Sequence, residues 1–147
     1  TTNIYYTPKY FDNTKEKSDA NYYGSRFILA EDEKLLNTFK TTAESKFNIK
    51  IKQINENSGI DIRNLNNFKP HKDNKNAKIN ILIMLVGPTA VTNGTVFYSD
   101  DKLDIHVGFK ENRSVLFPST LTHSPHASNI PNLRRFTSTL FVKDYEE

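Results

Sequence analysis

The chain has 147 residues, a formal net charge of +3, no cysteine and a hydrophobic share of 36%. This composition excludes disulfides and thiolate metal sites, and no apolar run is long enough to cross a membrane as a helix. Ten Phe and seven Tyr supply large apolar areas, so a chain of this length can bury a core of its own. We therefore expect one cytoplasmic domain over residues 1–147, with no membrane partner.

The positive charges are scattered along the sequence. Lys110 lies near Arg113, and Arg134 precedes Arg135, but no run of five basic residues occurs. A basic stripe is the usual electrostatic mark of a nucleic-acid groove, and this chain has none that is evident. Nucleic acid is therefore not an expected partner.

The N-terminal part, residues 1–70, predicts one helix among short strands. Residues 1–23 are polar and predict loops that leave room for a short strand, and residues 24–30 predict a strand. Residues 31–47 predict a helix, because Leu35, Leu36, Phe39 and Ala43 recur at helical spacing behind an acidic first turn. Strict alternation over 48–54 predicts a half-buried strand, and the Asn-rich stretch 55–69 predicts a loop that holds a strand at 60–65.

The remaining part, residues 71–147, shows no helical period. Residues 77–86 are apolar on both faces and predict a buried strand, followed by a turn-rich connection at 87–93. Further strands are predicted at 95–98, 103–107, 113–117 and 135–142. Short strands separated by turn signals are typical of a sandwich or barrel. The expected fold is mainly β with a flanking helix, in which residues 1–70 support a core formed by 71–147.

A pair of metal-ligand residues stands where this second part begins. His71 and Asp73 are spaced i, i+2, so in extended backbone their side chains point to the same face. With one more histidine they would form a facial triad, which suits non-haem Fe(II) because coordination positions stay open. Taken alone, the pair is a weak signal and is more typical of a polar loop, since Asn74, Lys75 and Asn76 follow it.

From His71 onward the chain resembles the catalytic core of the iron(II)/2-oxoglutarate-dependent dioxygenases, in particular the prolyl-hydroxylase-like branch. The residues that carry the resemblance are HKDNKNAKINILIML, NGTVFY, KENRSVLFPSTLTH and RRFTSTLFV. They stand in the family's order, and His123 lies 50 positions after Asp73. The similar part covers about half of the chain.

The resemblance implies a double-stranded β-helix, which is a jelly-roll, cupin-like barrel. It assigns His71, Asp73 and His123 as catalytic Fe(II) ligands, and Arg135 as the residue that pairs with the far carboxylate of 2-oxoglutarate. Thr137 lies two residues further along, on the same strand face, and could add a hydroxyl to that carboxylate. The implied reaction uses O₂ to hydroxylate an unidentified protein or small-molecule substrate, for example a peptidyl proline, and releases succinate and CO₂. Ascorbate is a further cofactor that the resemblance allows.

Two of these assignments have rivals in the sequence. His126 lies three residues after His123, but His123 follows Phe-Pro-Ser at the spacing of the family. Arg134 competes with Arg135, and only one of the two can enter the barrel, because adjacent strand residues face opposite ways. His106 lies in an alternating strand and is more typical of a surface or core histidine than of a ligand.

The chain also departs from the family. The strand after the metal-ligand pair often carries a tyrosine that binds the cosubstrate, and Leu85 stands near that place; Tyr98 on the next strand is the candidate to replace it. A nucleobase-repair oxygenase is an alternative function, but such enzymes usually carry a second arginine six residues after the first. Leu140 and Phe141 occupy that region here. A cupin-like module that binds without catalysis is another alternative.

Overall fold

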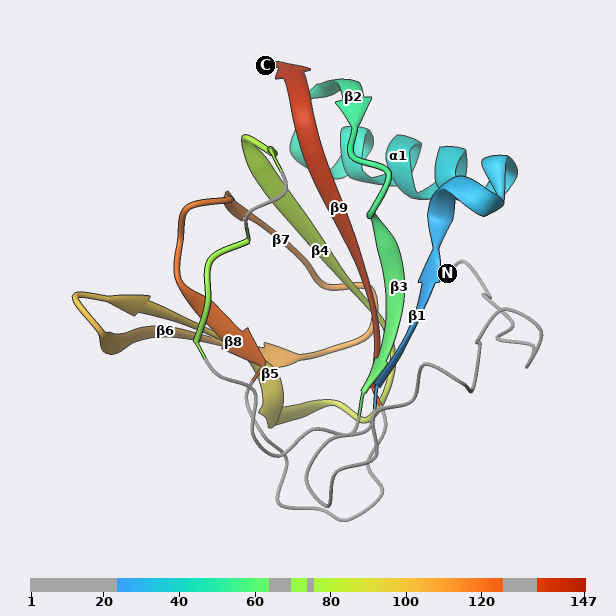
Figure 1. Cartoon of the computed structure of the whole chain (residues 1–147). Helices are drawn as coiled ribbons and strands as arrows, with labels where there is room; N and C mark the ends of the chain where they lie inside the picture. Colours follow the sequence, from blue (N-terminus) through green and yellow to red (C-terminus); the bar gives the residue numbers. More distant parts are fainter. Residues whose placement is uncertain (1–23, 64–69, 74–75, 126–134) are drawn as a thin grey trace.

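The computed structural model describes residues 24–63, 70–73, 76–125 and 135–147, which form two antiparallel β-sheets and one α-helix (Figure 1). The helix α1 spans Glu33–Phe47 and follows a 3₁₀ turn at Leu29–Glu31. The strands are β1 (Gly24–Ile28), β2 (Lys50–Ile54), β3 (Gly59–Arg63), β4 (Ile79–Val86), β5 (Ala90–Ser99), β6 (Lys102–Phe109), β7 (Ser114–Pro118), β8 (His123–Pro125) and β9 (Arg135–Glu146). No helix in the described part of the chain has the length and apolar character that a membrane span needs.

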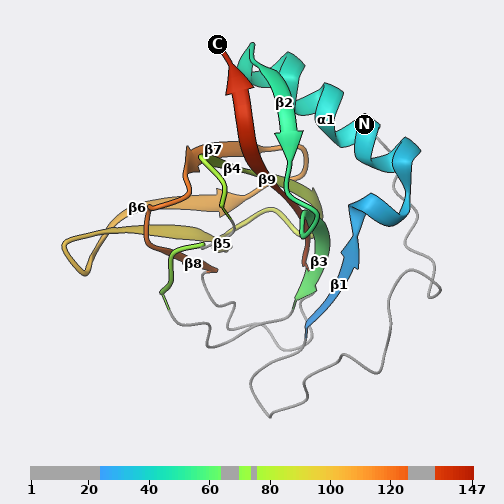
Figure 2. The same cartoon turned by 45° about the horizontal axis from the view of Figure 1, so that its top comes forward.

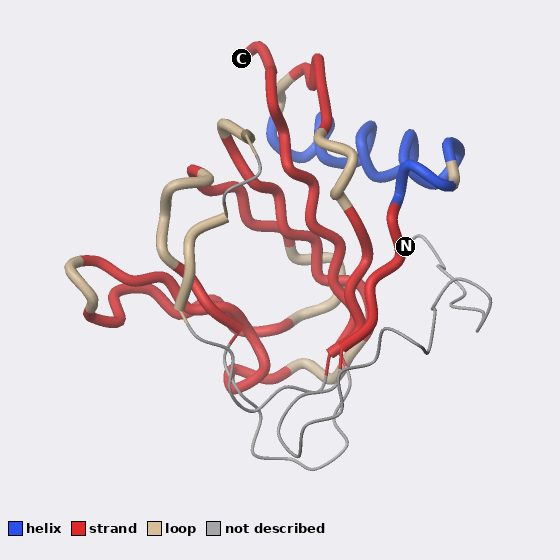
Figure 3. The backbone as a smooth tube through the Cα atoms, in the orientation of Figure 1, coloured by secondary structure: helices blue, strands red, loops and turns tan. Residues whose placement is uncertain are grey.

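The larger sheet is built around the last strand. Its order is β1-β3-β9-β4-β7, and β2 pairs with the C-terminal half of β9. The first half of β9 lies between β3 and β4, and all of these pairings are antiparallel. The tube in Figure 3 shows the strands of this sheet running side by side.

The smaller sheet has the order β6-β5-β8. An isolated antiparallel bridge between His71 and His123 adds the segment before β4 to the free side of β8. Along the chain, strands change sheets repeatedly: β4 belongs to the larger sheet, β5 and β6 to the smaller, β7 to the larger, β8 to the smaller and β9 to the larger. This alternation brings segments that are far apart in sequence to the space between the sheets.

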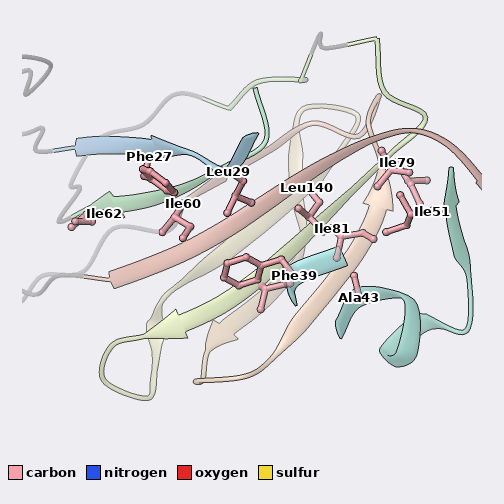
Figure 4. Close-up of a cluster of buried hydrophobic side chains, with 12 residues drawn as sticks. Phe27, Leu29, Phe39, Ala43, Ile51, Ile60, Ile62, Ile79, Ile81 and Leu140 are labelled. Atoms are coloured by element: carbon pink, nitrogen blue, oxygen red, sulfur yellow. The ribbon is translucent and has the colours of Figure 1, made fainter. Parts of the chain in front are cut away.

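The helix packs on the outer face of the larger sheet. Asp32 caps its start by accepting a hydrogen bond from the Leu35 amide at 3.0 Å, and Asn48 ends it in the left-handed conformation at φ 52°. Phe39 and Ala43 are buried in the cluster that Figure 4 shows. Figure 2 shows α1 on the side of the larger sheet that faces away from β5, β6 and β8.

The two faces of β4 serve two different cores, which explains why its sequence is apolar on both. Ile81 and Ile83 point outward into the cluster beneath α1. Leu82 and Met84 point inward, where they pack with three aromatic side chains of the other strands, Phe97, Phe109 and Phe117. Deleting a side chain from either core would therefore leave a cavity against β4.

Most predicted elements are confirmed, and the differences are local. The helix begins at Glu33 rather than residue 31, and Leu35 and Leu36 are only partly buried against the core. The connection 87–93 is shorter than predicted because β5 already begins at Ala90, with an irregular register up to Thr95. The strand β8 was not predicted, since three residues are too few for a periodic pattern. The predicted loops at 1–23 lie outside the described residues.

Candidate metal centre

The three residues assigned from the sequence meet between the two sheets. His71 and His123 exchange backbone N–H···O hydrogen bonds of 2.9 Å in each direction, which holds their side chains next to each other. His71 Nε2 lies 3.5 Å from Asp73 Oδ1, and His123 Nε2 lies 3.2 Å from Asp73 Oδ2. One ligand atom from each residue lies within 4.8 Å of the others. The donor atoms are therefore close enough to share one ion.

The tautomer of His123 determines whether its Nε2 can donate a hydrogen bond to Asp73 Oδ2. Its Nδ1 lies 2.9 Å from the Leu121 carbonyl oxygen, which can only accept, so Nδ1 carries the hydrogen. In the neutral ring Nε2 is then an acceptor, and it faces a carboxylate oxygen of Asp73, which is also an acceptor. Two acceptors at this distance repel each other unless a proton on Nε2 or a metal ion lies between them. The geometry thus fits a cation at this place.

Asp73 is oriented from the other side by β4. Asn80 Nδ2 donates a 2.7 Å hydrogen bond to Asp73 Oδ2. Burial raises the pKa of Asp73, but the hydrogen bonds and charges of His123 and His71 outweigh it and hold the pKa well below its usual range. Asp73 is therefore an ionised carboxylate at neutral pH, as a metal ligand must be.

The three side chains differ in exposure. The side chains of His123 and Asp73 are 10% and 15% exposed, whereas that of His71 is 34% exposed. Phe117 packs edge-on against the His123 ring with 4.9 Å between ring centres, and Phe97 lies behind at 6.2 Å. The centre therefore has an apolar wall on the His123 side and opens towards His71.

A cavity extends from the triad between the sheets. The described residues that line it are Arg26, Asp61, His71, Asp73, Leu82, Thr95, Phe117, His123, Pro125, Arg135, Thr137, Thr139 and Phe141. Alternate residues of β9 contribute to this wall, while Phe136 and Leu140 pack in the core on the other face. Their parity follows from the pleat of the strand.

Arg135 crosses from the larger sheet to the smaller one. It is 5% exposed, and its Nη1 donates hydrogen bonds to the carbonyl oxygens of Asn93 at 2.9 Å and Gly94 at 2.5 Å. Both carbonyls belong to β5, whose next residue, Thr95, also lines the cavity. Arg135 thus provides a buried cation in the cavity that contains the triad. The rivals Arg134 and His126 lie outside the described residues.

Two other residues considered from the sequence lie elsewhere. The hydroxyl of Tyr98 is 3.0 Å from Ser124 Oγ, and Tyr98 points to the opposite face of β5 from Thr95 and Phe97. It is not among the described residues that line the cavity, because the pleat turns it away. His106 pairs with Val96 and does not belong to the metal-ligand group among the described residues.

Sequence reasoning missed four residues of the site. Asn80 is a fully buried polar residue inside an apolar strand, and that pattern was a usable signal. Thr95 is buried, and among the described residues its hydroxyl has no hydrogen-bond partner. Arg26 and Asp61 each interrupt a short apolar strand, but their pairing depends on the β1–β3 register, which the sequence does not reveal.

Comparison with known proteins supports the fold. No protein-family model and no curated protein matches the sequence. The structure is similar to the crystal structure of an oxidoreductase of the 2OG-Fe(II) oxygenase family from Burkholderia pseudomallei, with a TM-score of 0.54 and 13% sequence identity. The match covers 89% of this chain and 71% of that chain. At this identity the likeness shows a shared fold.

Proposed function

We propose that this protein is an Fe(II)- and 2-oxoglutarate-dependent dioxygenase built on a double-stranded β-helix. The repeated change of strands between two facing sheets and the fold shared with a 2OG-Fe(II) oxygenase family protein support this assignment. The observation that carries it is the set of two imidazoles and one carboxylate converging beside a cavity that also holds a buried arginine. This donor set suits non-haem iron.

His71, Asp73 and His123 would hold the metal. Asn80 and the Leu121 carbonyl would orient two of these ligands through the hydrogen bonds already described, a support that metal sites commonly need. Bound Fe(II) would supply the activation of O₂, coupled to the decarboxylation of 2-oxoglutarate to succinate and CO₂ and to hydroxylation of the substrate. Ascorbate would serve as a reductant for the iron.

Arg135 would bind the far carboxylate of 2-oxoglutarate. Its guanidinium is fixed by two backbone carbonyls and remains charged when buried. Thr137 and Thr139 follow on the same face of β9, and Thr95 of β5 lines the same cavity. Hydroxyls beside a guanidinium would complete the hydrogen bonds of a carboxylate, and the buried hydroxyl of Thr95 would gain a partner. Tyr98 has no part in this proposal.

The apolar wall formed by Phe117 and Leu82 would keep water away from the triad. Exclusion of water strengthens electrostatic interactions in a site and protects reactive species from side reactions. The more exposed side, at His71, would be the side from which substrate approaches. We propose a peptidyl residue such as proline as the first substrate class to test.

The function is tested first by binding and then by turnover. Anaerobic addition of Fe(II) and 2-oxoglutarate to the metal-free protein should produce a visible charge-transfer absorption, and admission of O₂ should then yield succinate. His71→Ala, Asp73→Ala and His123→Ala should each abolish both signals while circular dichroism stays near wild type. His106→Ala is the matched control and should retain them.

Two results would overturn this assignment. One is a wild-type protein that gives neither absorption nor succinate, as expected of a binding module without catalysis. The other is full activity in His123→Ala with loss in His126→Ala, which would show that His126 is the metal ligand in place of His123. A screen of proline-containing peptides, read by succinate formation and product mass, would then address the substrate.

A further inference from the structure

The cavity wall contains a second arginine that is tied to a buried carboxylate. Arg26 on β1 donates from Nε to Asp61 Oδ1 at 2.8 Å and from Nη2 to Asp61 Oδ2 at 3.1 Å. Its guanidinium carbon lies 5.9 Å from the centre of the Phe141 ring. Both charged residues line the same cavity as the triad and Arg135. This bidentate ion pair fixes the orientation of the Arg26 guanidinium.

The neighbouring strand is shaped to let this side chain pass. A Cβ atom on Gly59 would lie 3.1 Å and 3.2 Å from Cγ and Cδ of Arg26, and 2.7 Å from the carbonyl oxygen of Phe27. The stem of Arg26 therefore crosses β3 at a residue without a side chain. Because Gly59 leaves this space, the guanidinium of a residue on the outermost strand can reach the cavity.

Asp61 occupies a place where a negative charge would oppose anion binding. It is 5% exposed and stands directly opposite Thr137 in the β3–β9 register. Side chains opposite each other in an antiparallel pair lie about 5 Å apart at their Cβ atoms. An acid held by Arg135 and Thr137 would therefore lie close to this carboxylate, and like charges in a buried site repel strongly.

The charges of the described lining residues balance. Arg26 and Arg135 are offset by Asp61 and Asp73. A divalent ion on the triad would then leave two net positive charges, which match the two negative charges of a dicarboxylate. Without Arg26, one of those positive charges would be lost, and the negative charge of Asp61 would repel the ligand more strongly.

We propose that Arg26 is a positioning and specificity residue for a dianionic 2-oxo acid, acting by neutralising Asp61. The negative charge of Asp61 weakens anion binding, and the positive charge of Arg26 counteracts this effect. This inference rests on the proposed function, since it presumes that a dicarboxylate binds at Arg135. If the ion pair only held β1 and β3 together, removing either Arg26 or Asp61 would weaken 2-oxoglutarate binding, because both changes would loosen the fold.

The test is the affinity for 2-oxoglutarate, measured by calorimetry on the Mn²⁺-loaded protein. Arg26→Gln should weaken binding by about tenfold or more, which corresponds to about 1.4 kcal/mol. Asp61→Asn should bind as tightly as wild type or more tightly. The double variant should return to within about threefold of wild type, because both charges are then removed together.

Arg113→Gln is the matched control, because Arg113 is exposed and donates to the Gly108 carbonyl away from the cavity. It should not change the affinity, and circular dichroism should show that each variant is folded. Weaker binding in Asp61→Asn, or unchanged binding in Arg26→Gln, would overturn the inference while wild-type binding keeps the proposed function intact. If wild type itself binds no 2-oxoglutarate, the proposed function fails and this inference fails with it. If Arg26→Gln does not fold, the 2-oxoglutarate affinities of Asp61→Asn and of the double variant still test the inference.

Discussion

At the scale of single residues, the candidate site consists of a few side chains whose partners lie on other strands. Asp73 is held by Asn80 from β4, His123 by the carbonyl of Leu121, and Arg135 by two carbonyls of β5. Each of these contacts restricts a side chain that would otherwise rotate. Removing one contact should therefore change affinity for the metal or the acid more than it changes the fold.

Arg135→Ala should weaken 2-oxoglutarate binding by on the order of a hundredfold or more. Breaking a buried charge pair costs about 3–5 kcal/mol, and about 1.4 kcal/mol corresponds to a factor of ten. Calorimetry on the Mn²⁺-loaded protein would measure the change. Arg134→Ala, at a position outside the described residues, should have little effect. Equal losses in the two variants would mean that Arg135 is not the residue that holds the cosubstrate.

Asn80→Ala should lower the affinity for divalent metal by about 10–100-fold, the usual result of removing a hydrogen bond to a metal ligand. The reason is that Asp73 Oδ2 loses the 2.7 Å contact that orients it. Competition with a coloured chelator would measure the affinity. Ser138→Ala is the control, because Ser138 is buried on the opposite face of β9, outside the cavity. The same loss in both variants would argue for a general effect of the core.

At the scale of elements, β9 and β4 lie between the candidate site and the helix α1 that packs on the larger sheet. Their inner faces line the cavity, and their outer faces pack under α1. The helix therefore stabilises the larger sheet without reaching the site. Substitutions at the ends of α1 should change the free energy of unfolding but not the metal affinity of the candidate site.

Asp32→Ala should lower the free energy of unfolding by about 1 kcal/mol, because the Leu35 amide loses its cap. For a chain of this size that corresponds to a fall of roughly 2–4 °C in melting temperature. Differential scanning calorimetry would measure it, and metal affinity should be unchanged. Asp104→Ala, an exposed position on β6, should shift neither quantity. A loss of metal affinity in Asp32→Ala would show that α1 and the cavity are coupled.

Periodicity predicted the long elements well and the short ones poorly. The apolar run of β4 and the spacing of Phe39 and Ala43 carry strong patterns, because each packs a continuous face. The three residues of β8 carry no period at all, although they bring His123 to the site. The meeting of His71 with His123 depends on long-range pairing, which only the family resemblance suggested. No sequence pattern indicated the Arg26–Asp61 contact, because charged residues in short strands usually face water.

At the scale of the whole molecule, the site lies where the two sheets come together, so ligands should stabilise the folded chain. Mn²⁺ and 2-oxoglutarate, each at a hundred times its dissociation constant, should add about 2.7 kcal/mol per ligand to the free energy of unfolding. Urea titrations with and without the ligands would measure the gain. Asp73→Ala should lose most of it. An equal gain in that variant would place the bound metal elsewhere.

The bridge between His71 and His123 has a kinetic consequence. Among the described residues, His71 and His123 are joined by two hydrogen bonds in an isolated bridge. We therefore expect the segment that carries His71 to separate from β8 without unfolding either sheet. Such local openings have low free energies and are visible as fast amide hydrogen exchange. An ion that holds both imidazoles would close this opening. The amides of His71 and His123 should then exchange rapidly in the metal-free protein and slowly once the ion is bound, while amides in the middle of β4 keep one rate throughout.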